Sequence, residues 1–197
     1  MKFEREIGNI YRLKVPFEDI YTSVFLLKTE RGYMLVDCAT TEKDVQEWLL
    51  PALKEMGLSI QDMQFLLLTH KHGDHAGGLT EILKSHPTIE IIDTLCQFFG
   101  NLEIYPLQGH TQDCIGLLEI STGTLISGDG LQGAGVGRYR CSLESKEDYL
   151  TTIKKIRKDG RIKNILFSHD YEPWNRDGVF GREEVEKILE DCKKVVI

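Results

Sequence analysis

The first clear pattern along the chain is a pair of short apolar segments joined by a polar turn. Residues 24–28 and 33–38 are largely apolar, and the letters TERG at residues 29–32 separate them. Two such segments with glycine in the connection predict a β-hairpin. Residues 63–69, MQFLLLT, are continuously apolar and predict a strand that is buried on both faces.

Helix-forming and strand-forming segments then alternate to the end of the chain. A helix is expected from Thr41 toward Gly57, with Pro51 as a kink or break. Three more helices are predicted at residues 76–85, 146–158 and 182–194, and Ser145 is expected to cap the second of these. Further strands are predicted at residues 89–93, 104–107, 115–120, 124–127 and 164–168, with residues 121–123 joining a second hairpin.

Chain length and composition indicate one globular domain, residues 1–197. A chain of 197 residues can bury one good core but leaves little room for a second. Hydrophobic residues make up 41% and charged residues 28%, which is ordinary for a globular protein. The net charge of -7 repels a phosphate backbone, so nucleic acid is not expected as a partner.

The sequence also predicts where the protein resides. No apolar run approaches the roughly 18 residues that a bilayer-spanning helix needs, so no membrane partner is expected. The amino-terminal residues mix charge into each apolar stretch and carry no export signal, which predicts a cytoplasmic protein. The cysteines form no C-x-x-C pair and are odd in number, which favours reduced, mostly buried thiols; they are Cys38, Cys96, Cys114, Cys141 and Cys192.

Candidate chemistry is concentrated in the letters HKHGDH, which follow the long apolar strand segment. In an extended chain, side chains two residues apart point to the same side, so His70 and His72 can bind one metal ion. Gly73 is expected to let the backbone turn sharply, so that Asp74 and His75 aim at a second point nearby. One loop can therefore serve two metal ions.

Three more residues of ligand type follow other predicted strands or lie in tight loops. His110 lies in GHT after residues 104–107, Asp129 lies between two glycines, and His169 lies in SHD after residues 164–168. A rigid scaffold can hold such side chains toward one point. Five of the six histidines fall in these motifs, which argues against their being ordinary core residues.

The ordered motifs THKHGDHAGG, GHT, GD and SH resemble those of the metallo-β-lactamase-fold hydrolases. The resemblance extends from the early strand that ends at Asp37 to His169 and so covers most of the chain. It implies an α+β fold, the four-layer αββα sandwich of the metallo-β-lactamase type, with the site at one edge of two central sheets. It also implies the metal ligands: His70, His72 and His110 for a first ion, Asp74, His75 and His169 for a second, and Asp129 as the bridge.

The resemblance further implies catalysis by two divalent metal ions. Imidazole and carboxylate ligands without thiolate suit zinc, with manganese or iron as alternatives. Paired ions about 3.5 to 4 Å apart can hold a bridging hydroxide as the nucleophile. We expect this hydroxide to attack a carbonyl or phosphoryl centre, with Asp74 orienting it and Asp129 bridging the ions.

The expected substrate is a small-molecule thioester, lactone or other ester, because the chain resembles the compact, glyoxalase-II-like members of the family. The chain ends soon after His169, without the long helical region that shapes the glutathione pocket of those enzymes, so glutathione itself is not implied. Three alternatives stay open: an oxidoreductase similar to the mononuclear-iron persulfide dioxygenases, a phosphodiesterase of the same fold, and a non-catalytic metal-binding protein. The substrate, the physiological metal and the oligomeric state are not fixed by the sequence.

Several residues beside the motifs have structural explanations. Asp37 is expected to support the site without binding metal, and Asp113 and Asp170 are expected to be solvated caps. His86, which precedes Pro87 at a helix end, is expected to be exposed.

Two further segments leave two interpretations open. The glycine-rich loop at residues 131–142 either cradles a substrate anion or is a flexible surface loop; its polar side chains include Arg138, Tyr139 and Arg140. The segment after His169 either walls a pocket or serves another purpose; it contains Tyr171, Trp174 and Asn175.

Overall fold

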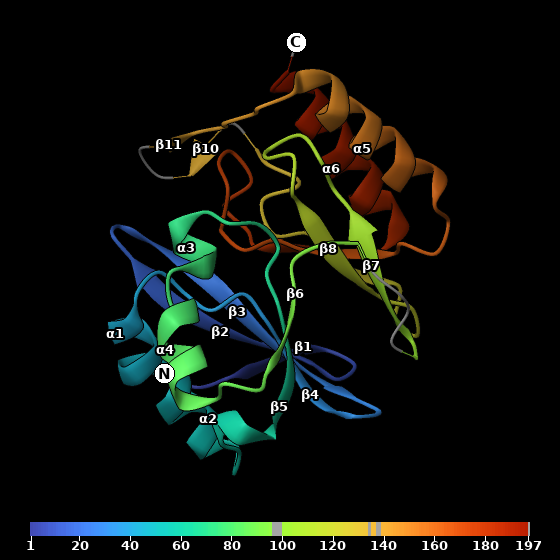
Figure 1. Cartoon of the computed structure of the whole chain (residues 1–197). Helices are drawn as coiled ribbons and strands as arrows, with labels where there is room; N and C mark the ends of the chain where they lie inside the picture. The colour runs from blue at the N-terminus through green and yellow to red at the C-terminus, as the bar shows by residue number, and fades with distance from the viewer. Residues whose placement is uncertain (96–99, 134, 137–138, 197) are drawn as a thin grey trace. The chain divides into compact units, whose positions relative to one another are not determined.

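The computed structural model describes the main chain of residues 1–95, 100–133, 135–136 and 139–196, and the side chains of these ranges outside 134–140 (Figure 1). The chain divides into two compact units, Met1–Asp93 and Thr94–Ile197. Each unit has its own sheet and its own helices, which confirms the predicted mixed α and β class. That the two units form one domain stays a prediction.

The first unit is built on a six-stranded sheet in which the strands follow one another in sequence order. Its strands are β1 (Glu4–Ile7), β2 (Ile10–Phe17), β3 (Ile20–Thr29), β4 (Gly32–Val36), β5 (Met63–Leu67) and β6 (Glu90–Ile92). Strands β1 to β4 are antiparallel neighbours, whereas β5 runs parallel to both β4 and β6. The predicted first hairpin is β3–β4, and β3 begins four residues earlier than the pattern indicated.

Strand β2 carries a charged residue that the pattern of hydrophobic positions did not explain. Arg12 is only 1% exposed. Its guanidinium lies 3.0 Å from the Glu6 carboxylate and 4.9 Å from the centroid of the Phe25 ring. The arginine is tolerated inside because a carboxylate and an aromatic face surround its charge.

The helical segments of the first unit differ in detail from the predictions. The helix expected after Thr41 is wound as α1 (Glu42–Asp44), a π-helical turn η1 (Val45–Leu49) and α2 (Leu50–Glu55), followed by a 3-10 turn η2 (Ile60–Asp62). The helix is not broken at Pro51, but its winding changes from π-helical to α-helical immediately before this residue, between Leu49 and Leu50. The helix predicted at residues 76–85 is two helices, α3 (Gly73–Ala76) and α4 (Leu79–Ser85), separated at Gly77 and Gly78.

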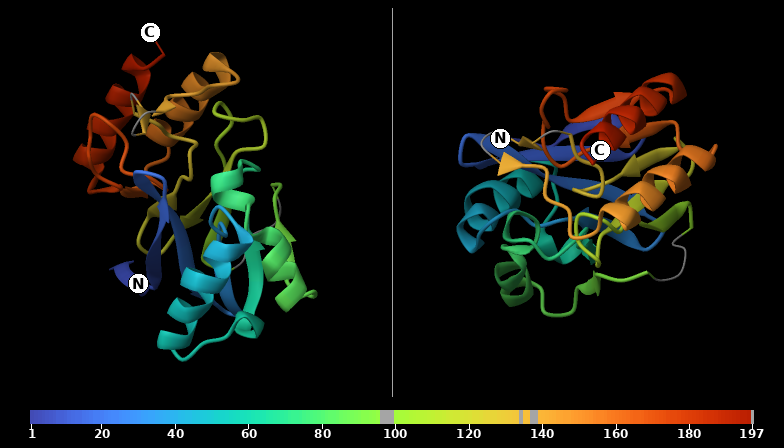
Figure 2. Two further views of the ribbon diagram at one scale, coloured as in Figure 1. Left: turned by 90° about the vertical axis from the view of Figure 1, so that its left-hand side faces the viewer. Right: turned by 90° about the horizontal axis from the view of Figure 1, so that it is seen from above.

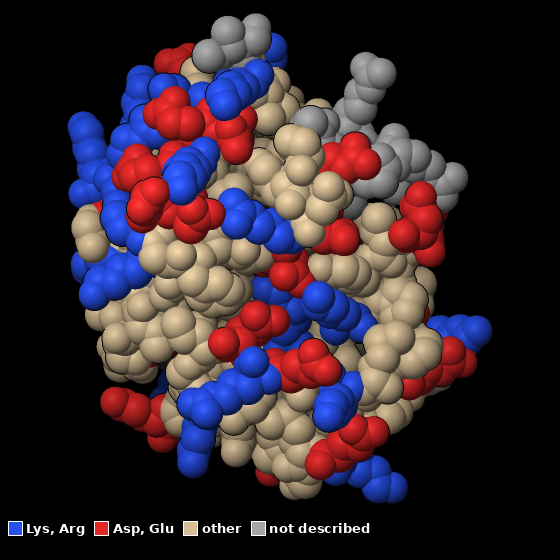
Figure 3. All heavy atoms as spheres, turned by 180° about the vertical axis from the view of Figure 1, so that it is seen from behind, with Lys and Arg blue, Asp and Glu red and all other residues tan. Residues whose placement is uncertain are grey.

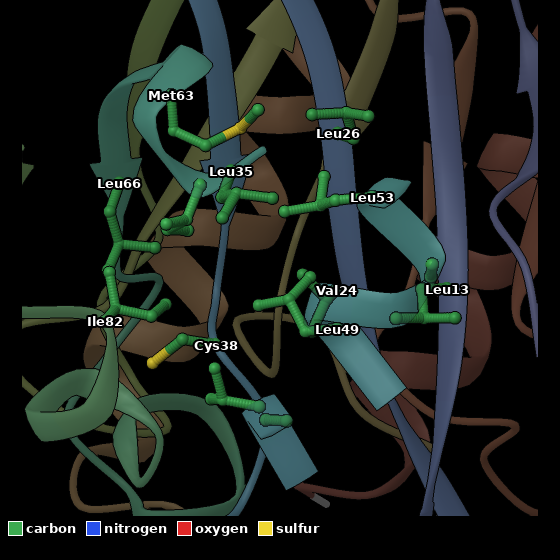
Figure 4. Packing of buried hydrophobic residues seen from close by; sticks show 14 of the residues in the cluster. Leu13, Val24, Leu26, Leu35, Cys38, Leu49, Leu53, Met63, Leu66 and Ile82 are labelled. Carbon is green, nitrogen blue, oxygen red and sulfur yellow. The ribbon is translucent and has the colours of Figure 1, made fainter. Parts of the chain in front are cut away.

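The core of the first unit lies between its sheet and these helices (Figure 4). Leu13, Val24 and Leu35 come from the strands, and they pack with Leu49 and Leu53 from the helical segment. All five are 0% exposed. Each fully buried leucine or valine contributes about 1.5–3 kcal/mol relative to an exposed one, which fixes the sheet that precedes the histidine-rich loop.

The second unit has a five-stranded sheet with the order β13-β12-β9-β8-β7. Its strands are β7 (Leu102–Pro106), β8 (Ile115–Glu119), β9 (Thr124–Ile126), β12 (Asn164–Leu166) and β13 (Gly178–Phe180). The predicted second hairpin is β8–β9, and β9 is parallel to β12. A separate two-stranded ribbon pairs β10 (Gly135–Val136) with β11 (Tyr139–Arg140).

Two long helices of this unit have the bounds that the sequence predicts, α5 (Lys146–Lys158) and α6 (Arg182–Lys194). Ser145 caps α5, because its hydroxyl accepts a hydrogen bond from the backbone N–H of Asp148 at 3.2 Å. The two helices lie side by side (Figure 2). Their buried faces carry apolar residues three and four positions apart, including Ile153, Ile156, Val185, Ile188 and Leu189.

The surface mixes both signs of charge. On the face shown in Figure 3, acidic and basic side chains are interspersed. Ion pairs also form on α6, where Lys187 lies 3.0 Å from Glu183 and 2.8 Å from Glu184. No helix in the described ranges is long and apolar enough to cross a bilayer.

Candidate metal centre

The loop after β5 brings three histidine rings together. The centroids of His70 and His72 lie 4.7 Å apart, and those of His70 and His75 lie 4.2 Å apart. His70 and His75 are buried, whereas His72 is exposed. One carboxylate oxygen of Asp74 lies 3.4 Å from Nε2 of His75. The first unit therefore gathers four of the seven predicted ligands within one loop.

Asp37 organises this loop from the end of β4. Its Oδ1 accepts a hydrogen bond from the backbone N–H of Thr69 at 2.8 Å, and its Oδ2 lies 2.8 Å from Nδ1 of His75. Because a carboxylate only accepts, Nδ1 of His75 donates, and the lone pair of this ring is on Nε2. This contact agrees with the supporting role predicted for Asp37.

Thr69 extends the same network to His70. Its hydroxyl lies 2.9 Å from Oδ2 of Asp37 and 3.2 Å from Nδ1 of His70. The hydroxyl has a single hydrogen, which it donates to the carboxylate, so Nδ1 of His70 donates to the hydroxyl oxygen. His70 and His75 therefore both carry the proton on Nδ1 and present a lone pair at Nε2.

The glycines of the loop act differently from the prediction. Gly73, expected to permit a sharp turn, begins α3, and a Cβ at this position would meet nothing within 4 Å. The close approach occurs at Gly77 and Gly78 instead. A Cβ on Gly77 would lie 1.8 Å from the Thr40 carbonyl oxygen, and one on Gly78 would lie 2.1 Å from the Cys38 carbonyl oxygen. These two glycines let the histidine loop pack directly against the chain that follows Asp37.

In the second unit, two ligand-type residues follow neighbouring parallel strands. Ile126 at the end of β9 pairs with Leu166 at the end of β12. Asp129 and His169 each come three residues after these positions. Because the carboxyl ends of parallel strands meet at one edge of a sheet, the two side chains lie close together, with Oδ1 of Asp129 3.5 Å from Nε2 of His169.

His110 joins these two residues from the loop between β7 and β8. Its Nε2 lies 3.8 Å from Oδ2 of Asp129. The two oxygens of the Asp129 carboxylate therefore face two different histidines. The preceding Gly109 has a φ of +140°, and a Cβ there would lie 2.5 Å from the Cα atom of Tyr149. The loop that carries His110 thus depends on glycine for its contact with α5.

The sequence did not single out Gln132 or Ser142, which surround His110. The Ser142 carbonyl oxygen lies 2.7 Å from Nδ1 of His110. Nε2 of Gln132 lies 2.8 Å from the same nitrogen and 3.5 Å from Oδ2 of Asp129. Gln132 is only 4% exposed. Its position three residues after Asp129 matches no motif, so only the folded chain reveals this contact.

The aromatic residues after His169 form a packed cluster. The ring of Tyr171 lies 5.6 Å from that of His169 and 6.2 Å from that of Trp174, measured between centroids. Trp174 borders a cavity of about 290 Å³, which is also lined by Gly133, Pro173, Asp191, Lys194 and Val195. Asn175 is exposed, and its amide donates to the Pro173 carbonyl at 3.4 Å. Trp174 thus borders a cavity that none of the predicted ligands lines, and Tyr171 is buried, so the two interpretations of this segment stay open.

The remaining predictions near the site have mixed outcomes. His86 is half-buried, not exposed, because its Nε2 lies 2.9 Å from the Met63 carbonyl oxygen. Asp113 accepts a hydrogen bond from the Thr111 hydroxyl at 2.6 Å, as a local cap. Arg138 lies outside the described residues, as do the side chains of Tyr139 and Arg140, so both interpretations of that loop stay open.

No disulfide joins the cysteines within the described residues. Cys38, Cys114 and Cys192 are buried, and Cys141 is half-buried. Burial raises the pKa of Cys192 to about 12, so this thiol stays protonated at neutral pH. This agrees with the prediction of reduced, mostly buried thiols, while Cys96 lies outside the described residues.

The sequence of the first unit is similar to that of a known family. Residues 18–95 match the sequence model of the metallo-beta-lactamase superfamily. A hydroxyacylglutathione hydrolase from Legionella pneumophila is 26% identical over 157 residues, which cover 66% of this chain and 61% of the relative. A hydroxyacylglutathione hydrolase from Vibrio cholerae is 26% identical over 178 residues, which cover 77% of this chain and 69% of the relative. The chain thus spans less than two thirds of the length of the Legionella relative.

Comparison with solved structures extends the fold to the whole chain. A metallo-beta-lactamase from Pseudomonas aeruginosa, solved in a mono-zinc form, has a TM-score of 0.74 at 15% identity and covers all of this chain and 96% of its own. A metallo-beta-lactamase from Pontibacter korlensis has a TM-score of 0.72 at 15% identity, covering 99% and 98% of the two chains. At this identity the likeness establishes the fold alone.

Proposed function

Residues 18–95 match the sequence model of the metallo-beta-lactamase superfamily, and the chain has the fold of the solved metallo-beta-lactamases. From these two likenesses we propose that the protein is a metal-dependent hydrolase of small-molecule esters. The proposed bond is that of a thioester, a lactone or another ester. The observation that carries the proposal is the Asp129 carboxylate, whose two oxygens face Nε2 atoms of two different histidines. A carboxylate held in this way is suited to join two cations.

We propose that the two ligand groups act together as one centre for two divalent ions. The first group is His70, His72, Asp74 and His75, and the second is His110, Asp129 and His169. One ion would be held by His70, His72 and His110, the other by Asp74, His75 and His169, with Asp129 shared between them. Zinc is the first choice, with manganese or iron as alternatives.

The donor atoms fit such ions. Imidazole nitrogens and carboxylate oxygens are ligands for zinc, manganese and iron, and no thiolate is involved. Nδ1 of His75 donates to Asp37 at 2.8 Å, and Nδ1 of His110 has the Ser142 carbonyl at 2.7 Å. Because each Nδ1 has an acceptor within hydrogen-bond distance, the lone pair for a metal is on Nε2.

The chain's own residues have distinct tasks in the proposed reaction. Two bound divalent ions would supply Lewis acidity and lower the pKa of water. Asp74, partly exposed beside His75, would orient the attacking water, and Asp129, beside His169, would be the ligand that the two ions share. Asp37 and Ser142 hold histidine rings in the tautomer that presents Nε2.

The substrate class rests on two observations. The hydroxyacylglutathione hydrolases among the relatives are named for a thioester substrate, and the two relatives named above are 26% identical to this chain over 66% and 77% of its length. The chain has a net charge of -7, and acidic and basic groups are interspersed on the face in Figure 3, which disfavours a phosphate polymer as the substrate. A small neutral or thioester-linked acyl compound is therefore the proposed substrate.

Metal content and hydrolysis, measured on the same preparation, test the proposal. The protein is loaded with zinc, analysed by mass spectrometry of the metals, and assayed on thioesters, lactones and phosphodiesters. We expect two ions per chain and turnover of a thioester or a lactone. In Asp129→Ala we expect the loss of metal binding and of turnover, while the circular dichroism spectrum stays that of a folded protein. The variant His86→Ala is the control, since His86 contacts the Met63 carbonyl and lies outside the ligand groups.

Other outcomes would contradict the proposal. A single iron with no hydrolysis would indicate an oxygenase of the persulfide dioxygenase type. Turnover of phosphodiesters alone would indicate a phosphodiesterase. Two bound metal ions without turnover of any substrate would indicate a non-catalytic metal-binding protein. Full activity in Asp129→Ala would remove the bridging role.

A further inference from the structure

A hydrogen-bond network in the second unit surrounds two proposed ligands, His110 and Asp129. It also includes Gln132 and Ser142, which lie between Asp129 and α5 in the sequence. The backbone N–H of Ser142 donates to Oε1 of Gln132 at 3.2 Å. Since an N–H group can only donate, this bond directs the oxygen of the Gln132 amide to Ser142 and its Nε2 to the other side. On that side lie Oδ2 of Asp129 at 3.5 Å and Nδ1 of His110 at 2.8 Å.

The backbone of Gln132 is fixed by a second buried residue. The Tyr149 hydroxyl accepts from the N–H of Gln132 at 2.9 Å and donates to its carbonyl oxygen at 3.0 Å. Tyr149 is 0% exposed, and burial raises the pKa of its hydroxyl well above the usual value, which keeps the proton needed for this double contact. Gln132 is therefore anchored at its main chain by α5 and at its amide by Ser142.

Nδ1 of His110 can satisfy only one of its two neighbours. A single proton on this nitrogen can be donated to the Ser142 carbonyl, whereas a lone pair there would accept from Gln132. The carbonyl belongs to the main chain and cannot turn away, whereas Nε2 of Gln132 has another acceptor, Oδ2 of Asp129, at 3.5 Å. Nδ1 therefore donates to Ser142, and the Nε2 hydrogens of Gln132 are directed to the Asp129 carboxylate.

We propose that Gln132 is a positioning residue of the metal centre, which orients the Asp129 carboxylate and links it to Ser142, the residue that orients His110. This inference rests on the proposed function, since it concerns the same site. The role of Gln132 follows from its own hydrogen bond. A charged carboxylate that receives an N–H bond keeps one orientation, so the two oxygens of Asp129 keep facing His110 and His169.

The test uses Gln132→Met, which keeps the side-chain length and removes both amide contacts. Zinc affinity is measured by competition with a fluorescent chelator, and unfolding by urea is measured on the metal-free protein. We expect zinc affinity to fall by about 10- to 100-fold, the usual effect of losing a residue that orients ligands. Gln112→Met is the matched control, because the exposed Gln112 amide also donates to a carboxylate, that of Asp148, at 3.1 Å.

A second readout does not require metal. Hydrogen exchange of the Ser142 amide is expected to be faster by about fivefold in metal-free Gln132→Met, because one hydrogen bond is lost. If Gln132→Met unfolds, Gln132→Asn, whose amide is one methylene too short, is expected to show the same two losses. Zinc affinity within twofold of the original chain in a folded variant would overturn the proposal.

The two proposals fail in different ways. If the unchanged protein takes up no zinc, manganese or iron, the proposed function is refuted, and the Ser142 exchange rate decides the role of Gln132 by itself. An unchanged exchange rate in Gln132→Met overturns the positioning role whatever the metal content. Loss of zinc affinity in both Gln132→Met and Gln112→Met also overturns it, because the effect would then not depend on contact with Asp129.

Discussion

Nδ1 of His75 lies 2.8 Å from Oδ2 of Asp37, and both side chains are fully buried. The two residues are 38 positions apart in the sequence. Asp37 has a left-handed backbone with a φ of 62°, at the end of β4, and it also accepts from the Thr69 main chain. One carboxylate thus fixes both the histidine ring and the strand end from which the histidine loop starts.

The first prediction concerns this contact. Asp37→Asn keeps the shape of the side chain but places an N–H group against either His75 Nδ1 or the Thr69 N–H, both of which are donors. We expect zinc affinity to fall by about 10- to 100-fold and the free energy of unfolding by about 1–3 kcal/mol. Chelator competition and urea unfolding measure the two effects.

The control for this change is Asp19→Asn, because Asp19 is exposed and lies in the turn between β2 and β3. It is expected to change neither quantity. Unchanged zinc affinity in Asp37→Asn would show that the carboxylate does not orient His75.

The second prediction concerns the two kinds of glycine in the histidine loop. Gly77→Ala would place a methyl group 1.8 Å from the Thr40 carbonyl oxygen, so the loop must move. We expect a loss of about 1–3 kcal/mol or more in the free energy of unfolding, with reduced zinc uptake. Gly73→Ala, which meets nothing within 4 Å at the start of α3, is the matched substitution.

Gly73→Ala is expected to leave stability unchanged or to raise it by up to about 1 kcal/mol, because alanine has less freedom in the unfolded chain. Equal destabilisation by the two substitutions, measured by urea unfolding, would show that the packing of residues 77–78 against residues 38–40 is not what requires glycine.

The third prediction concerns pH and the turn between β8 and β9. Burial of Glu119 raises its pKa, but hydrogen bonds from Ser121 and Thr122 outweigh burial, and the net effect is a pKa below the usual 4.5. A carboxyl group with a lowered pKa in the folded state stabilises the fold above its unfolded pKa. This stability is lost as the pH falls below about 4.5 and then through the lowered pKa of Glu119 in the folded state.

Glu119→Gln removes this charge and should lower the free energy of unfolding at pH 7 by about 1–3 kcal/mol. The difference between the two proteins is expected to shrink as the pH is lowered below 4.5, since protonation removes the same charge from the original chain. Urea unfolding at pH 7 and at successively lower pH measures this. If the difference in the free energy of unfolding stayed constant across this pH range, the pKa of Glu119 would not be lowered by folding.

The sequence alone predicted the local structure well where neighbouring residues decide it. The hairpins β3–β4 and β8–β9 follow from apolar segments with polar turns, and α5 and α6 have the predicted bounds. Strands β1 and β2 and the short β13 were not predicted. In β2 the buried Arg12 is stabilised by Glu6 and Phe25, which lie on other strands. The sequence of β2 by itself, with a charged residue at a buried position, therefore does not indicate a buried strand.

The sequence also indicated the candidate ligands, because five of the six histidines fall in the ordered motifs HKHGDH, GHT and SHD, with the aspartate of GD between the last two. The tertiary structure decided which atoms face one another. Parallel pairing of β9 with β12 brings Asp129 to His169, and contacts across 38 positions link Asp37 to His75. The sequence did not predict the contacts of Gln132 or the close approach of Gly77 to Thr40. Both depend on main-chain groups whose positions sequence spacing does not specify.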